Sequence, residues 1–232
     1  MKPASQSVCL CYARAVKFQK ILTGSVLLVA LIFGLGAPAF AQNNVLDLKP
    51  ADVNSDGDVV YGIFIYNRLF SEGKFIFEAL HLRIPGLDVV GDYNELSVGG
   101  GYRLVKRGGF QLYGLAHVGF ATDDQKYLQP AALMQFASGK WAASAFVQRY
   151  VALTDNAASA WLVDPAEIQY TIAGPVAVGA SVYVYRPDGG STLTKIGPKV
   201  SVADKYGATE LRVVHVNQGA SIEFQARRVI LF

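Results

Sequence analysis

Hydrophobic and polar residues alternate along most of this chain. In the segment 93–105, apolar or small residues at even positions alternate with residues from Glu95 to Arg103 at odd positions. The segments 174–186 and 193–203 show the same two-residue period. Because successive side chains of a β-strand point to opposite faces, this period predicts strands with one apolar and one polar face.

Similar runs, rich in Val, Ile, Tyr, Phe and Gly, are separated by clusters of Gly, Asp, Asn, Ser and Pro, which are typical of turns. We predict strands at 58–70, 74–84, 93–105, 109–121, 127–136, 140–151, 160–172, 174–186, 193–203, 207–216 and 220–232. Short connections alternate with longer ones, the longer ones being 85–92, 122–126, 152–159 and 187–192. An up-and-down transmembrane β-barrel has this alternation of short turns and long loops.

Strand parity adds one more element to this prediction. An even number of strands places both chain ends on the same side, so a strand must precede 58–70. The segment 44–50, followed by a loop at 51–57, is the candidate. The sequence therefore predicts an all-β fold, a single antiparallel up-and-down transmembrane β-barrel of twelve strands. Ten strands is the alternative if 44–70 is arranged differently.

The amino-terminal segment has the pattern of a secretory signal peptide. Residues 1–20 carry four basic residues and no acid, residues 21–36 are apolar, and small residues precede Gln42. This pattern predicts a signal peptide at 1–41, cleaved after Ala41, and a barrel domain at 42–232. The alternative is an uncleaved anchor, for which the apolar run is short.

Removal of 1–41 changes the charge of the chain. Both cysteines, Cys9 and Cys11, lie in this segment. The segment 42–232 keeps 17 basic and 18 acidic residues, which gives a formal charge of −1 in place of +3. We therefore expect no nucleic-acid partner.

The last strand places apolar side chains at Ile222, Phe224 and Ile230 and ends on Phe232. It resembles the closing strand of bacterial outer-membrane β-barrels. The resemblance implies location in the outer membrane, contact with its lipid, and insertion by the barrel assembly machinery with Phe232 as part of the signal. Arg228 falls on the predicted lipid face, unless a bulge at Arg227–Arg228 turns one of these residues inward.

A soluble exported β-sandwich or lipocalin-like barrel is the alternative to a membrane barrel. Its inside would be apolar and its outside polar, and alternation alone does not distinguish the two cases. The aromatic residues Trp141, Trp161, Tyr93, Tyr127 and Tyr150 lie near strand ends, where membrane-interface aromatics are expected.

On the membrane interpretation, the polar faces line the lumen. The predicted lumen-lining residues are Glu95, Arg103, Gln111, Tyr113, His117, Glu167, Lys195, Lys199, Glu210, Arg212, Glu223 and Arg227. Their charges either pair across neighbouring strands or line a narrow pore for an uncharged or sugar-like solute. The sequence favours a small porin-like channel over an enzyme, with a non-conducting structural or adhesion barrel as an alternative.

Two weaker patterns suggest a metal and a hydrolase. Asp52, Asn54 and Asp56 match the first half of a calcium loop, but its twelfth position is Ile63, and an ordinary turn is the other interpretation. We expect no other cofactor. His215, Asn217 and Glu223 resemble the carboxy-terminal motif of outer-membrane lipid A deacylases, in which Asn217 stands at the serine position. A lipid-modifying hydrolase is therefore the enzymatic alternative.

Overall fold

The computed structural model describes residues 44–55, 57, 59–87, 91–218 and 221–232. The predicted signal peptide and Asp56 lie outside the described residues. Within the described ranges, no helix has the length and apolar character needed to cross a membrane.

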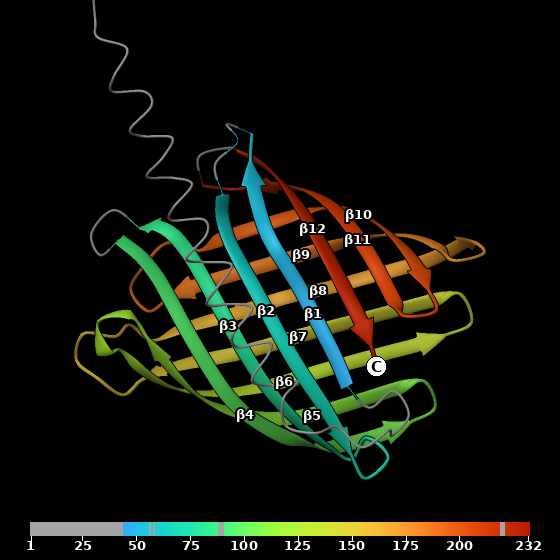
Figure 1. The fold of residues 1–232 in the computed structure, drawn as a ribbon, viewed down its shortest axis with the longest axis horizontal. Helices are drawn as coiled ribbons and strands as arrows, with labels where there is room; N and C mark the ends of the chain where they lie inside the picture. Colours follow the sequence, from blue (N-terminus) through green and yellow to red (C-terminus); the bar gives the residue numbers. More distant parts are fainter. Residues whose placement is uncertain (1–43, 56, 58, 88–90, 219–220) are drawn as a thin grey trace, which may run out of the picture. The chain divides into compact units, whose positions relative to one another are not determined.

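Twelve antiparallel strands close into one barrel, which confirms the predicted number and makes the alternative of ten strands wrong (Figure 1). Each strand pairs with the next along the chain, and β1 pairs with β12 to close the wall. The strands are β1 Asn44–Asn54, β2 Val59–Phe70, β3 Phe75–Leu87, β4 Gly91–Arg107, β5 Phe110–Ala121, β6 Lys126–Ser138, β7 Trp141–Ala152, β8 Ala160–Ala173, β9 Val176–Pro187, β10 Leu193–Asp204, β11 Gly207–Val216 and β12 Ile222–Leu231.

The first strand differs most from its prediction. β1 runs to Asn54, so most of the loop expected at 51–57 belongs to the barrel wall. The pairing register with β12 shifts between Leu48 and Asp52. Pro50 lies in this stretch and has no backbone N–H to donate to a neighbouring strand. The irregularity therefore absorbs the proline and lets the strand continue.

One end of the barrel carries two-residue turns at 108–109, 139–140, 174–175 and 205–206, and the other end carries connections such as 153–159 and 188–192. Gly139 and Gly174 sit in two of the tight turns with positive φ angles of 57° and 50°, a conformation that glycine adopts at little cost. Asn44 and Phe232 exchange backbone hydrogen bonds of 3.1 Å at the turn end. The two ends of the described barrel therefore lie together at the turn end, as the strand parity predicts.

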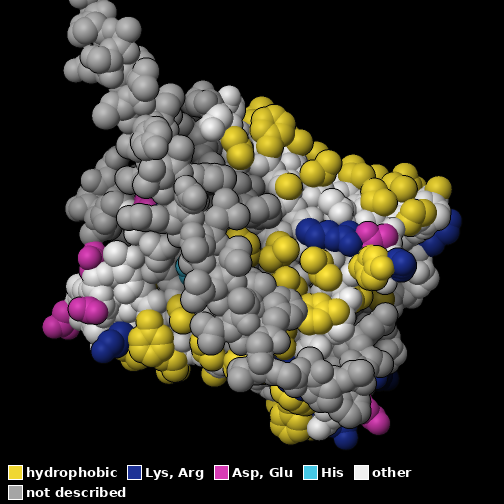
Figure 2. Space-filling model, viewed as in Figure 1, with side chains coloured by type: hydrophobic (Ala, Val, Ile, Leu, Met, Phe, Trp, Pro, Cys, Tyr) yellow, Lys and Arg dark blue, Asp and Glu magenta, His cyan; other side chains and the backbone are white. Residues whose placement is uncertain are grey.

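The barrel is apolar outside and polar inside. On β10, Ile196, Val200 and Val202 are 56%, 46% and 45% exposed, whereas Lys195 and Lys199 are each 2% exposed. Figure 2 shows hydrophobic side chains over much of the visible outer surface. A soluble barrel would have the opposite arrangement, so the lipocalin-like alternative is wrong, and this outer face suits contact with lipid.

The terminal strand keeps a regular register. β12 pairs with β11 without interruption from Gly207–Ile230 to His215–Ile222, so the bulge considered at Arg227–Arg228 is absent. Arg228 lies on the outer face near the turn end and forms an ion pair of 2.8 Å with Asp204. Arg227 points into the lumen, where it contacts carboxylates of other strands.

The aromatic residues at strand ends divide between the two faces. Trp141 and Trp161 are outward and half exposed, as expected of interfacial residues. The prediction is wrong for the tyrosines. Tyr127 and Tyr150 are buried in the lumen edge to face, with ring centroids 5.3 Å apart, and the Tyr93 hydroxyl donates to the buried Glu95. Tyrosine fits either face because its ring is apolar and its hydroxyl is polar.

If the middle of the outer face lies in lipid, an arginine substituted there should destabilise the barrel more than an arginine substituted near the rim. Leu211 lies mid-strand in β11 and is 61% exposed, whereas Leu153 is 55% exposed just beyond the loop end of β7. We expect Leu211→Arg to lower the free energy of unfolding by about 2–4 kcal/mol and Leu153→Arg by about 0–1 kcal/mol. Urea unfolding of barrels refolded in lipid vesicles measures both values. Equal small losses would contradict a lipid-facing surface.

Candidate functional site

The lumen collects the polar side chains and is the candidate site. The structure places all twelve predicted residues on the inward faces of β4, β5, β8, β10, β11 and β12. Eight of them are at most 6% exposed, namely Glu95, Tyr113, His117, Lys195, Lys199, Glu210, Arg212 and Glu223. Arg103, Gln111 and Tyr113 lie together near the turn end, where Arg103 and the Tyr113 hydroxyl both donate to Gln111 Oε1 at 3.3 Å.

Five further charged residues face the lumen and were not predicted to line it. They are Asp47, Lys49, Asp52, Glu78 and Asp164. Asp47 and Lys49 alternate with the outward Leu46 and Leu48, a signal that the short predicted strand obscured. Asp164 precedes Pro165 at a register shift in β8, where a simple two-residue period fails.

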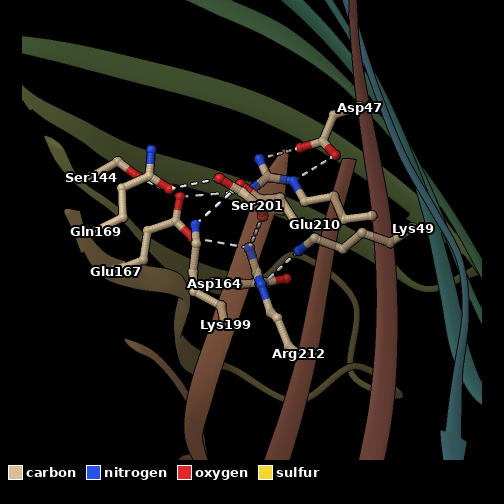
Figure 3. A network of polar contacts seen from close by, with 11 residues as sticks. Asp47, Lys49, Ser144, Asp164, Glu167, Gln169, Lys199, Ser201, Glu210 and Arg212 are labelled. Carbon is tan, nitrogen blue, oxygen red and sulfur yellow. Dashed lines mark hydrogen bonds and ion pairs between the residues drawn. The ribbon is translucent and has the colours of Figure 1, made fainter. Parts of the chain in front are cut away.

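Six of these charges form a connected network, which we call the ion-pair belt. Its members are Asp47, Glu167, Lys199, Glu210, Arg212 and Arg227 (Figure 3). Arg227 binds Asp47 through two nitrogens at 2.8 and 2.6 Å. Glu167 receives Lys199 at 2.7 Å and Arg212 at 2.9 Å. Each buried charge therefore has an opposite partner, which burial requires.

A separate ion pair crosses the lumen. Lys49 Nζ lies 2.9 Å from Asp164 Oδ1, and both side chains are at most 10% exposed. Lys49 is on β1 and Asp164 is on β8, with four strands between them one way around the wall and six the other way. The pair therefore spans the interior instead of following the wall. We call it the cross-lumen bridge.

The opposite side of the lumen is filled by apolar side chains near the turn end. Ile76, Tyr113 and Leu115 are buried there. Leu69, Ala131, Leu133 and Phe146 pack against them, so that β2, β3, β5, β6 and β7 all contribute. Near the turn end the lumen thus has an apolar sector over β2, β3 and β5–β7, and an ionic sector over β8, β10–β12 and β1.

Glu78 and Glu95 are buried carboxylates that lie outside the belt, on β3 and β4. Glu95 accepts hydrogen bonds from Ser97 at 2.7 Å, Gln129 at 2.6 Å and Tyr93 at 2.8 Å. Glu78 lies 3.1 Å from His117 Nε2 across β4. A Cβ at Gly99 would be 2.6 Å from the His117 ring, so glycine at this position allows the histidine to lie there. His117 therefore has a structural partner in the lumen.

The charges of the lumen do not balance. Among the described residues, eight carboxylates face inward, namely Asp47, Asp52, Glu78, Glu95, Asp164, Glu167, Glu210 and Glu223. Seven cations of the strands face them, namely Lys49, Arg103, Lys106, Lys195, Lys199, Arg212 and Arg227, of which Lys106 is exposed at the turn end opposite Gln111. The resulting formal charge of −1 favours cations over anions within the lumen.

A cavity of about 290 Å³ opens at the turn end beside the belt. Its polar lining comes from Gln111, Gln135, Ser144, Glu167 and Gln169, on four consecutive strands. Gly109, Phe136 and three alanines complete the lining. Glu167 belongs to both the cavity and the belt, so the cavity ends where the ion pairs begin.

Two residues of the possible calcium loop, Asp52 and Asn54, belong to β1 in the structure. The Asp52 carboxylate is buried in the lumen, accepts a hydrogen bond of 2.7 Å from Gln225 and lies 3.9 Å from Lys195. Asn54 ends β1, and Asp56 is not among the described residues. Among the residues described, no group of three or more His, Cys, Asp or Glu could hold a metal ion. The calcium loop stays a prediction.

The residues of the hydrolase alternative lie on opposite faces of the wall. His215 is exposed on the outer face of β11, whereas Glu223 is buried in the lumen and binds Lys195 at 2.7 Å. The Asn217 side chain accepts from the Thr194 backbone N–H and donates to the Thr192 carbonyl oxygen. The wall separates His215 from Glu223, so they do not form a common site, and no observation favours a hydrolase.

Known structures share this fold. No protein-family model and no curated protein sequence matches the chain. A KdgM porin superimposes with a TM-score of 0.60 at 12% identity, over 81% of this chain and 99% of the porin. A NanC porin gives 0.54 at 7% identity, over 81% and 99% of the two chains. The COG4313 outer membrane channel from Pseudomonas putida F1 gives 0.50 at 12% identity, over 85% and 97%. The chain therefore has the fold of small outer-membrane porins.

Removal of one partner of the cross-lumen bridge should be costly. Asp164→Asn leaves the Lys49 ammonium buried without a carboxylate, and we expect the free energy of unfolding to fall by about 3–5 kcal/mol. Lys49→Met combined with Asp164→Leu should recover most of this loss, because no buried charge remains. Urea unfolding in vesicles measures both. Similar stability of the single variant and the parent would show that the pair is hydrated.

Proposed function

We propose that this chain is an outer-membrane barrel that acts as a small porin-like channel for polar solutes. The main support is the polarity of the closed barrel, which is apolar toward its surroundings and carries charged and amide side chains along its lumen. A solute that crosses such a wall-enclosed lumen exchanges hydrogen bonds with water for hydrogen bonds with these side chains. The shared fold with small porins supports the same conclusion.

The charge of the lumen narrows the class of solute. One solved structure with this fold is a KdgM porin in complex with disordered oligogalacturonate, with a TM-score of 0.61. That complex concerns a sugar acid. In this chain the lumen carries an excess of carboxylates, and the cations of the belt and bridge are already paired. We therefore infer a preference for uncharged sugar-like or cationic solutes over anionic ones.

Passage requires movement of side chains and leaves the wall intact. The belt, the cross-lumen bridge and the apolar sector bury their side chains within the lumen, so they stand in the path of a solute. Every strand of the wall is hydrogen bonded to two neighbours, so the wall resists opening. Charged side chains that leave an ion pair can bind water or a polar solute instead. Apolar side chains cannot, so opening the packed apolar sector to a polar solute costs more free energy. We infer that solutes pass through the ionic sector.

A non-conducting structural barrel is the second candidate. The observation that favours it is the close packing of polar side chains in the lumen, with Gln129, Glu95 and Asp52 at most 1% exposed.

For both candidates we propose export with cleavage after Ala41, insertion by the barrel assembly machinery with Phe232 as part of the signal, and contact with outer-membrane lipid. The outward apolar face supports the lipid contact.

Planar-bilayer recordings distinguish the two candidates. The barrel 42–232 should give single-channel steps, and in a KCl gradient the reversal potential should shift toward the Nernst potential of K⁺, because the lumen is negative. Complete absence of steps over many insertions would favour the structural barrel.

Loss of the cross-lumen bridge should widen the path. We expect Lys49→Ala combined with Asp164→Ala to raise the single-channel conductance, since both side chains that span the lumen become short. Arg228→Ala combined with Asp204→Ala removes an ion pair from the outer face and is the matched control, for which conductance should stay unchanged. Equal conductance of all three proteins would mean that ions do not pass the bridge.

A further inference from the structure

We propose that the cavity at the turn end is a binding site for one uncharged, hydroxyl-rich ring, such as a single neutral sugar. The proposal rests on the proposed function, because it identifies where a polar solute is held. The cavity of about 290 Å³ is small for a ligand site, since such pockets span roughly 300–1,000 Å³. Its size suits a single ring better than an extended chain.

Three glutamines supply the hydrogen-bonding groups of this site. Gln111 uses its carbonyl oxygen to accept from Arg103 and Tyr113, and Gln169 uses its own to accept from Ser201 at 3.4 Å. Within the described part of the chain, no side-chain hydrogen bond occupies the amide nitrogen of either residue, or the amide of Gln135. The cavity therefore offers several N–H donors and a carbonyl acceptor.

This combination matches hydroxyl groups. A hydroxyl donates one hydrogen bond and accepts others, so it can use both the amide nitrogens and the Gln135 carbonyl oxygen. The three glutamines lie on β5, β6 and β8, within the four consecutive strands that line the cavity, and the wall holds them at fixed positions around the opening. A ring with several hydroxyls can contact more than one of them at once.

The charge of the cavity argues against an ionic ligand. Glu167 is the charged side chain of the lining, and it accepts from Ser144 at 3.1 Å while Lys199 and Arg212 lie within 2.9 Å of its other oxygen. Lys199 and Arg212 therefore already compensate the charge of Glu167, so a cationic ligand would gain little from it. An anionic ligand would meet this carboxylate without a free cation in the lining. A neutral ligand avoids both costs.

The cavity lies beside the ion-pair belt, where a solute would be held before it meets the paired charges. Figure 3 shows Ser144 and Gln169 beside Glu167, at the edge of the polar network that includes Lys199, Arg212 and Glu210. A ring held by Gln135 and Gln169 is therefore adjacent to the closed part of the ionic sector. The site would concentrate solute where the path narrows.

Binding can be measured on the folded barrel without any conductance. The barrel 42–232 is refolded in detergent, and D-glucose and sodium D-glucuronate are titrated while saturation-transfer NMR reports binding. The two sugars share a ring and differ by one carboxylate. We expect saturable glucose binding with millimolar affinity and glucuronate binding that is weaker by about tenfold, the effect of one uncompensated charge contact.

Variants connect this binding to the cavity. Gln135→Leu and Gln169→Leu should each weaken glucose binding about fivefold, the effect of one lost hydrogen bond. Gln218→Leu makes the same change at an exposed position on the loop side and should leave binding unchanged. Heat-modifiable gel migration checks that each variant is folded, and Gln135→Ala replaces Gln135→Leu if leucine prevents folding.

Several results would overturn the site. These are no saturation with glucose, unchanged binding in both cavity variants, or glucuronate binding as tight as glucose binding. The proposed function fails differently. A barrel that conducts ions but does not bind glucose loses this site and keeps the channel. A barrel that binds glucose through Gln135 but never conducts keeps the site and loses the channel.

Discussion

Closure of the backbone hydrogen-bond network is the constraint on which this structure depends. A strand edge exposed to hydrocarbon leaves N–H and carbonyl groups without partners, at a cost of several kcal/mol each. The pairing of β1 with β12 removes the last edge, even though the register of β1 shifts against both of its neighbours. The bulge around Pro50 is therefore tolerated because the alternative is an open barrel.

Closure then determines what the side chains must do. The outer face is apolar, so the polar residues gather inside, where the charged side chains are buried. Carboxylates and cations consequently pair across the lumen and not just along the wall. Glu167 connects β8 with β10, β11 and β12, and Lys49 connects β1 with β8. The same residues that stabilise the interior also obstruct it, so the stability of the barrel and passage through it oppose each other.

The sequence predicted the wall better than the lumen contacts. Alternation on β10 assigned Ile196 outward and Lys195 inward because strand geometry has a fixed two-residue period. The same rule gave the inward position of Arg227. It could not show that Lys49 meets Asp164, because a contact across the lumen depends on strand stagger and tilt, which local pattern does not encode. The inward turn of Tyr127 was missed for another reason, since tyrosine suits either face.

The cross-lumen bridge has a consequence for the order of folding. Lys49 and Asp164 are 115 residues apart in the chain, and strands that are not neighbours in the wall carry them. Their contact forms only when the wall between them has curved into a cylinder, so it is absent from early, open arrangements of strands. An interaction that forms late in folding slows unfolding more than it speeds folding. The bridge therefore lowers the rate of unfolding and prolongs the lifetime of the assembled barrel.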